Sequence, residues 1–271
     1  MASPKIVFIT GGNNGIGYEA VKALLQSPQS YHVFMGSRSI ERGQSAIEHL
    51  KKEVPGTQNT VELVQVDLIS DSSIENAFKQ ISTSHAKLDI LINNAGTTFD
   101  IEHLRGTATL RDSFTKTYDV NVAGTNVLTH TFAPLLLKSS DPRLLFIGGL
   151  SMLTQAADLS QPYWPIPAPP AGWPKPTPNP QFSVIGYRCS KVALNMLMLD
   201  WYWKLSADGV KVWCVQPGML ATDFAGSKEL AIEMGAGHPR EGGDIIRRVV
   251  EGERDGDVGR FVEKDGGFVA W

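Results

Sequence analysis

Short runs of apolar residues recur along the whole chain and alternate with amphipathic stretches. Several of the runs are apolar throughout, as expected for strands of a parallel sheet that is covered on both faces. The sequence predicts strands at residues 5–10, 31–36, 61–67, 88–93, 143–148, 210–216 and 259–263.

The stretches between these runs have the spacing of helices. In the stretch 71–85, apolar residues recur three and four positions apart, after Asp71 and Ser72 as candidate N-caps. These apolar residues are Ile74, Ala77, Phe78 and Ile81. Repeated strand-then-helix order predicts parallel strands joined by right-handed crossovers. We therefore expect an α/β fold with a single Rossmann-type doubly wound parallel sheet of about seven strands and helices on both faces.

Proline is concentrated in one segment of the chain. Residues 161–180 hold nine of the 16 prolines, and such a segment is usually an extended linker between domains. Here the strand and helix patterns continue in the same alternation on both sides of it. We therefore predict one domain over residues 1–271, with a proline-rich insertion at about 155–182.

Composition and charge restrict the partners. Hydrophobic residues make up 42% of the chain, which is enough for a large core, and the net charge is only −3 with no long basic run. A charge this small does not favour nucleic acid or an anionic membrane as a partner. We expect a small-molecule ligand, no nucleic acid and no membrane association.

The remaining composition indicates a cytoplasmic protein without a metal. Cys189 and Cys214 lack metal-like spacing, the six histidines are scattered, and two unpaired thiols are typical of the reducing cytosol. The apolar run near the N-terminus is too short for a signal peptide, and no stretch has the length of a spanning helix.

A glycine-rich loop follows the first predicted strand in "TGGNNGIGYEAVKALL". Gly11, Gly15 and Gly17 stand at a strand-to-helix turn, where backbone amides and a helix N-terminus can hold a pyrophosphate. Asn14 and Ile16 stand between these glycines and are included as candidate cofactor-binding residues. Glycines also occur in any tight turn, so the loop alone does not establish a dinucleotide site.

The end of the next strand indicates which dinucleotide is bound. It falls 20 residues after Gly17, where an NAD-binding fold places an acidic residue for the ribose hydroxyls. Here Ser37 and Arg38 occupy that place. A guanidinium offers donors for a 2′-phosphate and no acceptor for a hydroxyl, so Arg38 favours NADP (NADPH) over NAD. Alternatively, Arg38 is a solvated surface arginine.

Taken together, these motifs make the chain resemble the short-chain dehydrogenase/reductase family nearly from end to end. The matching segments are "TGGNNGIG", Asp67 after the third strand, "NNAG" at 93–96, Asn121, "YRCSK" and "QPGMLATDFAG". "SRSIERGQSAIEHL" and the ending "GRFVEKDGGFVAW" are most similar to the carbonyl-reductase branch, which also carries an insertion ahead of its tyrosine.

The resemblance assigns cofactor contacts to three residues. It implies that Asp67 hydrogen-bonds the adenine, Asn94 packs near the adenosine ribose and Thr222 contacts the nicotinamide carboxamide. All three follow strands, at the edge where open α/β sheets bind ligands. Each could instead be a turn residue.

The candidate catalytic pair is Tyr187 and Lys191, four residues apart in a helical stretch and therefore on one face. Such a spacing also occurs by chance, in which case the two form an ordinary surface pair. A nearby ammonium favours the ionised phenol, which predicts a lowered pKa for Tyr187 and a suitable general acid for carbonyl reduction. The resemblance implies that Lys191 also binds the nicotinamide ribose and that Asn121 holds a water that links Lys191 to solvent.

One family residue is missing. The family ends its fifth strand with two serines, the second of which hydrogen-bonds the substrate carbonyl, but Gly148 and Gly149 stand at those places. Ser151 follows two residues later. It supplies the hydroxyl if the backbone bulges or shifts register there, and it is otherwise a loop serine.

The insertion connects the fifth strand to the helix that bears Tyr187, so it should border the substrate pocket. Its aromatic residues either line an apolar pocket or attach the loop to the surface. They are Tyr163, Trp164, Trp173 and Phe182. By resemblance, the Tyr187 helix is where many family members form dimers or tetramers, and a bulky neighbouring loop predicts a monomer.

Two functions remain open at this point. The first is an NADPH-dependent reductase of a ketone or aldehyde, with a fairly large apolar substrate. The second is a cofactor-binding protein of the same fold without hydride transfer, either a sensor or a non-redox scaffold, which Gly148 and Gly149 bring into consideration.

Overall fold

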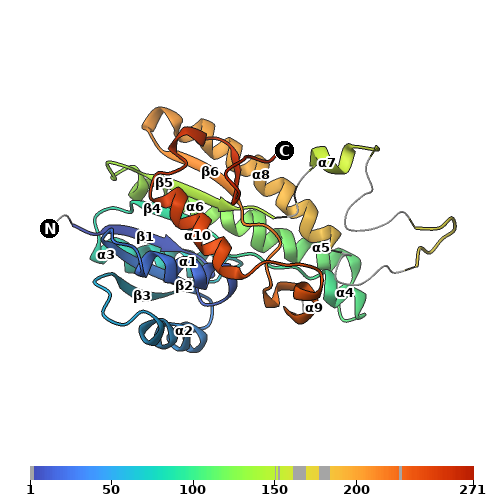
Figure 1. Ribbon diagram of the computed structural model, residues 1–271, viewed down its shortest axis with the longest axis horizontal. Coiled ribbons are helices and arrows are strands. Elements are labelled where there is room, and N and C mark those ends of the chain that lie inside the picture. Colours follow the sequence, from blue (N-terminus) through green and yellow to red (C-terminus); the bar gives the residue numbers. More distant parts are fainter. Residues whose placement is uncertain (1–2, 150, 152, 161–168, 177–183, 226–227) are drawn as a thin grey trace.

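The computed structural model describes residues 3–149, 151, 153–160, 169–176, 184–225 and 228–271. Its centre is a parallel sheet in the order β3-β2-β1-β4-β5-β6-β7 (Figure 1). The strands are β1 (Lys5–Ile9), β2 (Tyr31–Ser37), β3 (Thr60–Gln65), β4 (Ile90–Asn93), β5 (Arg143–Ile147), β6 (Lys211–Gln216) and β7 (Phe261–Glu263). All seven predicted strands are present, so the predicted sheet is confirmed.

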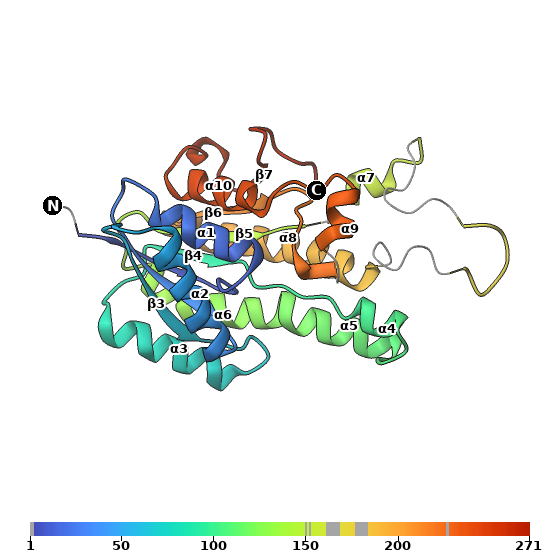
Figure 2. The ribbon, with the colours of Figure 1, turned by 60° about the horizontal axis from the view of Figure 1, so that its bottom comes forward.

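Helices cover both faces of the sheet. One core cluster packs α1, α2 and α10 on one face, and a second packs α3, α6 and α8 on the other. Figure 2 shows α3 and α6 side by side. The longer helices are α1 (Gly15–Leu25), α2 (Ile40–Glu53), α3 (Asp71–Ser84), α5 (Leu110–Tyr118), α6 (Thr125–Leu136), α8 (Ile185–Leu205) and α10 (Pro239–Val250). The shorter ones are α4 (Asp100–Leu104), α7 (Leu153–Ala157) and α9 (Lys228–Glu233).

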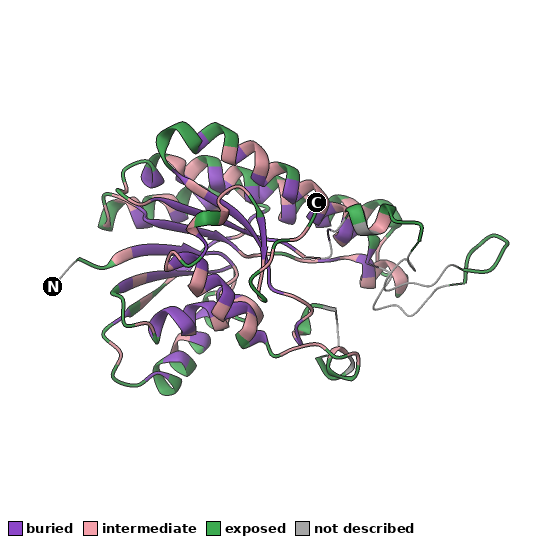
Figure 3. Ribbon diagram, turned by 45° about the horizontal axis from the view of Figure 1, so that its top comes forward, coloured by how far each residue is buried: buried purple, intermediate pink, exposed green. Residues whose placement is uncertain are grey.

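The apolar runs are explained by this layering. Along β1, Ile6 and Phe8 belong to the cluster with α3, α6 and α8, whereas Val7 and Ile9 belong to the opposite cluster. Each of these four side chains is buried, and Figure 3 shows the strands as the buried centre of the molecule. A strand covered on both faces needs apolar residues at every position, not at alternate ones.

Helix α3 confirms the predicted periodicity and corrects its cap. Ile74, Ala77 and Ile81 are buried. The N-cap is Ser70, whose hydroxyl accepts from the backbone N–H of Ser73, so Asp71 and Ser72 lie inside the first turn. The prediction was one residue off because serine and aspartate residues stand together there and only the backbone dihedrals decide which one caps.

The order of the strands places a crevice at one edge of the sheet. β1 pairs with β2 on one side and with β4 on the other. Strands β2 and β3 are therefore added on one side of β1 and strands β4 to β7 on the other, so the strand order reverses between β3 and β4. Ligands of such sheets bind beyond the carboxyl ends of the strands at this reversal. The chain leaves the same edge at Gly148 after β5 and reaches α8 at Ile185, and β6 then pairs with β5.

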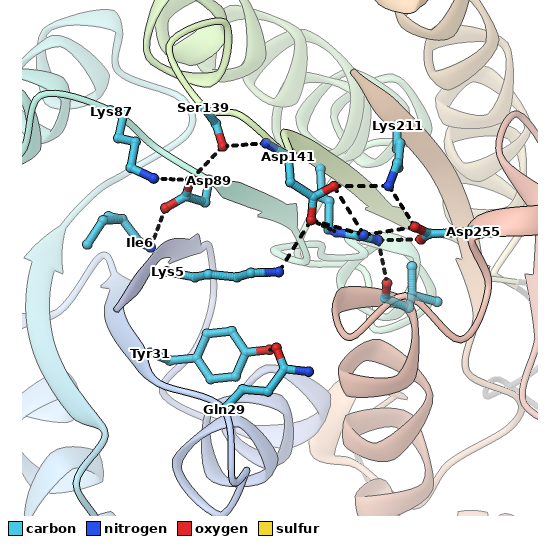
Figure 4. A network of polar contacts seen from close by, with 12 residues as sticks. Lys5, Ile6, Gln29, Tyr31, Lys87, Asp89, Ser139, Asp141, Lys211 and Asp255 are labelled. Atoms are coloured by element: carbon cyan, nitrogen blue, oxygen red, sulfur yellow. Dashed lines mark hydrogen bonds and ion pairs between the residues drawn. The ribbon is translucent and has the colours of Figure 1, made fainter. Parts of the chain in front are cut away.

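The opposite, amino-terminal edge carries a charged network (Figure 4). Arg143, the first residue of β5, is 3% exposed and hydrogen-bonds both Asp141 and Asp255. Lys211 at the start of β6 bridges the same two carboxylates at 3.0 and 2.6 Å, and Lys5 of β1 reaches Asp141. The network joins the starts of three strands, so it supports the fold and lies away from the crevice.

None of the helices in the described residues is both long enough and apolar enough to cross a membrane.

Candidate active site

The glycine loop needs glycine at three positions, two because of their φ values and one because of a close approach. Gly11 and Gly15 have φ values of 63° and 53°, in the left-handed region that favours glycine. A Cβ on Gly17 would overlap the carbonyl oxygen of Gly11. The loop therefore folds tightly over the N-terminus of α1, with Asn14 at the N-cap and Ile16 in the first turn.

Asn94 fastens this loop to the end of β4. Its side-chain amide donates to the carbonyl oxygens of Thr10 at 2.8 Å and Gly11 at 3.1 Å. The Thr10 hydroxyl in turn accepts from the backbone N–H groups of Asn94 and Ala95. Asn94 thus shapes the glycine loop, a role that the sequence did not indicate.

Thr222 lies against the other side of the loop. Its methyl carbon would be 3.4 Å from a Cβ on Gly15. The segment after β6 and the glycine loop after β1 therefore face each other at the carboxyl edge, although Gly15 and Thr222 are 207 positions apart in the chain.

The edge beyond β2 is open and polar. Ser37 is buried and donates to the carbonyl oxygen of Ser39, whereas Arg38 is exposed. A cavity of about 430 Å³ lies between the glycine loop and α2, and its lining includes Asn13, Asn14 and Arg42.

Asn13 and Arg42 of this lining were missed from the sequence. Arg42 stands four residues after Arg38, in the first turn of α2, and this nearness in the chain could have identified it. The acidic Glu41 also lines the cavity, so the charge there is mixed.

Asp67 follows β3 at the same edge. Its carboxylate accepts from the backbone N–H of Ile69 at 3.3 Å, and its own N–H donates to the Ser73 hydroxyl at 3.0 Å. These contacts are those of a turn residue. They leave most of the hydrogen-bonding capacity of the carboxylate unused.

Tyr187, Lys191 and Asn121 come together at the ends of β4 and β5. The ammonium of Lys191 donates to the carbonyl oxygen of Ile147 at 2.7 Å and lies 5.6 Å from the centre of the Tyr187 ring. A Cβ on Gly96, the last residue of "NNAG", would be 3.4 Å from both the Lys191 nitrogen and Oδ1 of Asn121. The three predicted residues therefore share one site, and Gly96 leaves room for the lysine and the asparagine to approach.

Asn121 is locked into the backbone around it. It lies in a π-helical segment, Asp119–Gly124, between α5 and α6. Its amide nitrogen donates to the carbonyl oxygen of Thr97 and to the Ser190 hydroxyl, and its oxygen accepts from the N–H of Thr97. Single π turns inside helices are frequent at functional sites.

The pKa values of the pair differ from the prediction. Burial raises the pKa of Tyr187 above its ordinary value, whereas the sequence predicted that Lys191 would lower it. Burial also lowers the pKa of Lys191 to about 8. The prediction was wrong because loss of water disfavours both charged forms, and the ammonium points to Ile147, not to the phenol oxygen.

The two glycines after β5 are enclosed by other side chains. A Cβ on Gly148 would be 2.7 Å from the Phe261 ring of β7. A Cβ on Gly149 would be 2.5 Å from the hydroxyl oxygen of Tyr187. The space that the two family serines would need is thus occupied by Phe261 and by the phenol of Tyr187.

Ser151 belongs to a buried polar network behind these glycines. It is 1% exposed, accepts from the Asn195 amide at 3.0 Å, and donates to the carbonyl oxygen of Gly149 at 3.3 Å. Asn195 in turn accepts from the thiol of Cys214. The hydrogen bond from the Ser151 hydroxyl to Gly149 is long for a hydroxyl donor. The Ser151 hydroxyl can therefore turn to another acceptor at little cost.

Phe224 is a further residue that the sequence did not single out. Its ring centre lies 4.6 Å from that of Tyr187, and the residue is 38% exposed. Its place two residues after Thr222 could have identified it.

Of the aromatic residues predicted to border the pocket, only Trp173 lies in the described part of the chain, where it is 88% exposed. Tyr163, Trp164 and Phe182 lie outside the described residues. The segment 169–176 extends away from the sheet in Figure 1.

No group of three or more His, Cys, Asp or Glu side chains in the described ranges could hold a metal ion.

The fold and the site define an α/β protein with a glycine-rich loop and a Tyr–Lys pair at the carboxyl edge of one parallel sheet. The family model for short chain dehydrogenases matches residues 5–160. The chain belongs to this family, which confirms the resemblance.

The relatives agree with this assignment. Short-chain dehydrogenase/reductase tropE of Talaromyces stipitatus is 44% identical over 98% of this chain and 97% of its own length. Short-chain dehydrogenase/reductase eupG of a Phoma species is 42% identical over 94% and 93%. Among solved structures, the NADPH-bound carbonyl reductase from chicken fatty liver has a TM-score of 0.76 and 24% identity over the full length of both chains.

Proposed function

We propose that this protein is an NADPH-dependent carbonyl reductase that reduces a ketone or aldehyde of a fairly large apolar small molecule. The observation that carries the proposal is the grouping of three residues where β4 and β5 end: Lys191 and Asn121 both lie beside Gly96, and the Lys191 ammonium lies 5.6 Å from the centre of the Tyr187 ring. The similarity in fold to a carbonyl reductase that binds NADPH supports the reaction type.

The glycine loop would hold the cofactor. The positive φ values of Gly11 and Gly15 and the crowding at Gly17 favour glycine at all three positions, so amides and the N-terminus of α1 can meet a pyrophosphate. Arg42 and Asn13, which line the cavity near α2, would bind a 2′-phosphate together with Arg38, which is exposed and is not among the lining residues. Asp67 and Thr222 would contact the adenine and the carboxamide, and Asn94 would hold the loop that carries the ribose.

The reaction needs a proton donor beside a carbonyl carbon that accepts hydride. When bound, the nicotinamide supplies the hydride. Tyr187 would then donate its phenolic proton to the carbonyl oxygen, where negative charge develops as the C=O double bond becomes a single bond. A phenol with an ordinary pKa of about 10 is already protonated at neutral pH. Burial raises the pKa of Tyr187 further and makes it a weaker acid, so its proton transfer depends on the negative charge that develops on the substrate oxygen.

Lys191 and Asn121 would return the proton to Tyr187. With a pKa lowered to about 8, Lys191 can release and regain a proton near neutral pH. Asn121 would hold the water that connects Lys191 to solvent, and Lys191 would also bind the nicotinamide ribose. Ser151 would donate to the substrate carbonyl after turning away from Gly149.

The apolar character of the substrate rests on the surroundings of Tyr187. Phe224 presents a partly exposed ring directly beside the phenol. Small-molecule pockets are mostly lined by such apolar and aromatic side chains. We also propose, as the sequence predicted, that the insertion at about residues 155–182 borders this pocket; its segment 169–176 does not support this, since it extends away from the sheet (Figure 1) and Trp173 is 88% exposed.

The test is a screen of ketones and aldehydes against NADPH oxidation, with the Tyr187→Phe variant as the control. The proposal expects turnover with at least one apolar carbonyl compound, and a loss of about 10²- to 10⁴-fold in kcat in the variant with unchanged NADPH affinity. A variant that keeps the parent's rate would contradict the role of Tyr187.

The alternative is a cofactor-binding protein without hydride transfer. The absence of serines at Gly148 and Gly149, with the phenol of Tyr187 seated over Gly149, favours it. Tight NADPH binding with no oxidation by any carbonyl compound would support this alternative.

We propose in addition that the chain is one domain over residues 1–271, a monomer, and cytoplasmic. Strands from both sides of the insertion lie in one sheet, and Cys189 and Cys214 are free thiols, which suits a reducing compartment. Light scattering of the pure protein tests the monomer, and a stable tetramer would contradict it.

A further inference from the structure

Helix α8 carries both Tyr187 and Lys191 but has no cap of its own. It is 21 residues long, its N-cap residue is Val184, and its first turn holds no acidic residue. The first N–H groups of a helix have no partner inside the helix, and leaving them unpaired in a buried place is costly. The partners of these groups must therefore come from elsewhere in the chain.

Asp100 supplies these partners from a distant part of the sequence. Its carboxylate accepts from the backbone N–H of Gly186 at 3.0 Å and from the N–H of Tyr187 itself at 2.9 Å. Asp100 is the first residue of α4 and lies more than 80 positions before α8 in the chain. The helix that bears the tyrosine thus begins on a side chain of another helix.

The Asp100 carboxylate is buried and accepts hydrogen bonds from several donors. Asp100 is 3% exposed, and it also accepts from the hydroxyls of Thr98 at 2.7 Å and Ser113 at 3.2 Å. Four donors and the positive end of a long helix compensate for the burial of a negative charge. A carboxylate fixed in this way has little freedom to move, so neither has the first turn of α8.

The glycine next to Tyr187 fits this arrangement. A Cβ on Gly186 would be 2.9 Å from Oδ1 of Asp100. A side chain at position 186 would push the carboxylate away from the two N–H groups.

The backbone carbonyl group of Tyr187 is also hydrogen-bonded, through residues of the active site. The carbonyl oxygen of Tyr187 accepts from the Ser190 hydroxyl at 2.7 Å, and this hydroxyl accepts from Asn121 at 2.9 Å. The N–H of Tyr187 is therefore fixed by Asp100, and its carbonyl group is fixed through Ser190 by Asn121.

We propose that Asp100 is a positioning residue that holds the first turn of α8 and thereby sets the place of the Tyr187 phenol. The inference rests on the proposed reductase function, because the position of Tyr187 matters only if it transfers a proton. An amide at position 100 would keep the size of the side chain but could not accept from both N–H groups through two oxygens.

The experiment compares Asp100→Asn with a matched control, Asp112→Asn. Asp112 belongs to the capping box of the neighbouring helix α5, where it accepts from Thr109; it is half-buried, and none of its hydrogen bonds in the described structure reaches the site. Both variants should lower the melting temperature, because each loses a helix cap. Only Asp100→Asn should lower kcat, by about 10- to 100-fold, since small displacements of a reacting group have effects of this size.

Further readouts separate positioning from a loss of folded protein. We express kcat per NADPH-binding site, measured by titration, so that unfolded protein does not lower it. The KM for the carbonyl compound should stay within about threefold of the parent value while kcat falls. Hydrogen exchange at the amides of Gly186 and Tyr187 should become faster in Asp100→Asn and stay unchanged in Asp112→Asn. A kcat of Asp100→Asn equal to that of the parent, or unchanged exchange at both amides, would overturn the proposal.

If the Asp100→Asn variant does not fold, the Gly186→Ala variant tests the same proposal. Alanine normally stabilises a helix relative to glycine, so a similar loss of kcat in this variant would point to the displaced carboxylate. A parent protein that oxidises no NADPH would refute the proposed function, and the exchange experiment would still decide whether Asp100 holds the helix. An active parent with an equally active Asp100→Asn variant would refute the inference alone.

Discussion

The hydroxyl oxygen of Tyr187 lies against the α-carbon of Gly149, so that a Cβ added there would come within 2.5 Å of it. Real Cβ atoms do not approach other atoms this closely, so a larger residue at 149 must displace the phenol. The residue that the family would place there is a serine. In this protein, the absence of the serine and the position of the tyrosine are therefore linked.

Gly149→Ser should lower kcat, not raise it. The new Cβ would push the phenol from its place, and a shift of about 1 Å in a reacting group can cost about 10²-fold. Gly149→Ala should have the same effect, because the Cβ and not the hydroxyl causes the clash. Steady-state kinetics measure both variants.

The control is Gly256→Ser, where an added Cβ meets nothing within 4 Å. It should leave kcat unchanged. A higher kcat with Gly149→Ser but not with Gly149→Ala would contradict this prediction. It would show that the Tyr187 side chain can move aside and that the added hydroxyl assists the reaction.

Ser151→Ala should lower kcat by about 10²- to 10³-fold, the usual loss when one donor to a developing oxyanion is removed. NADPH affinity, measured by fluorescence titration, should not change. The comparison is Asn195→Ala, which removes the partner of Ser151 but keeps its hydroxyl. Equal losses in the two variants would show that the hydroxyl only holds the loop after β5.

Arg38→Asp should weaken NADPH binding by about 10- to 100-fold, since charge-assisted hydrogen bonds to a phosphate are worth about 1.5 to 3 kcal/mol. NADH binding should change much less, because NADH has no 2′-phosphate. Fluorescence titration with both cofactors measures this difference, and Arg105→Asp, an exposed arginine after α4, is the control. Equal affinity of the unmodified protein for the two cofactors would contradict the role of Arg38.

The charged network at the amino-terminal edge of the sheet should make the stability of the fold depend on pH. Burial by itself would raise the pKa of Asp141, but the hydrogen bond from Lys211 and the charge of Arg143 outweigh it and lower the pKa to about 2. Since this folded value lies below the unfolded value of about 4, the stabilisation is complete above about pH 4 and is lost as the pH falls through about 2.

Asp141→Asn should therefore lower the melting temperature at pH 7, and the difference from the parent should shrink between pH 4 and pH 2. The control is Asp200→Asn, which removes an exposed pair with Lys204 on α8 and should have little effect at any pH. A difference for Asp141→Asn that stays constant from pH 7 to pH 2 would contradict the network's role.

Much of the fold was predictable because it is encoded locally. Most strands are apolar runs, and α3 has its apolar residues at helical spacing. The order of these elements, with the glycine loop after the first strand and Tyr187 four residues before Lys191, was sufficient to predict the sheet and the family. The sequence also showed the missing serines at Gly148 and Gly149.

The tertiary structure decided what depends on contacts between distant residues. The direction of the Tyr187 and Lys191 pKa shifts follows from burial, which no spacing along the chain reveals. The cap of α8 comes from Asp100, and the space beside Gly149 is filled by the phenol of Tyr187. The sequence by itself thus determined the elements, their order and the residue types of the site, because periodicity and motifs are local. Only the packed structure determined which groups lose water and which donors and acceptors meet, because these depend on segments that fold against one another across the sheet.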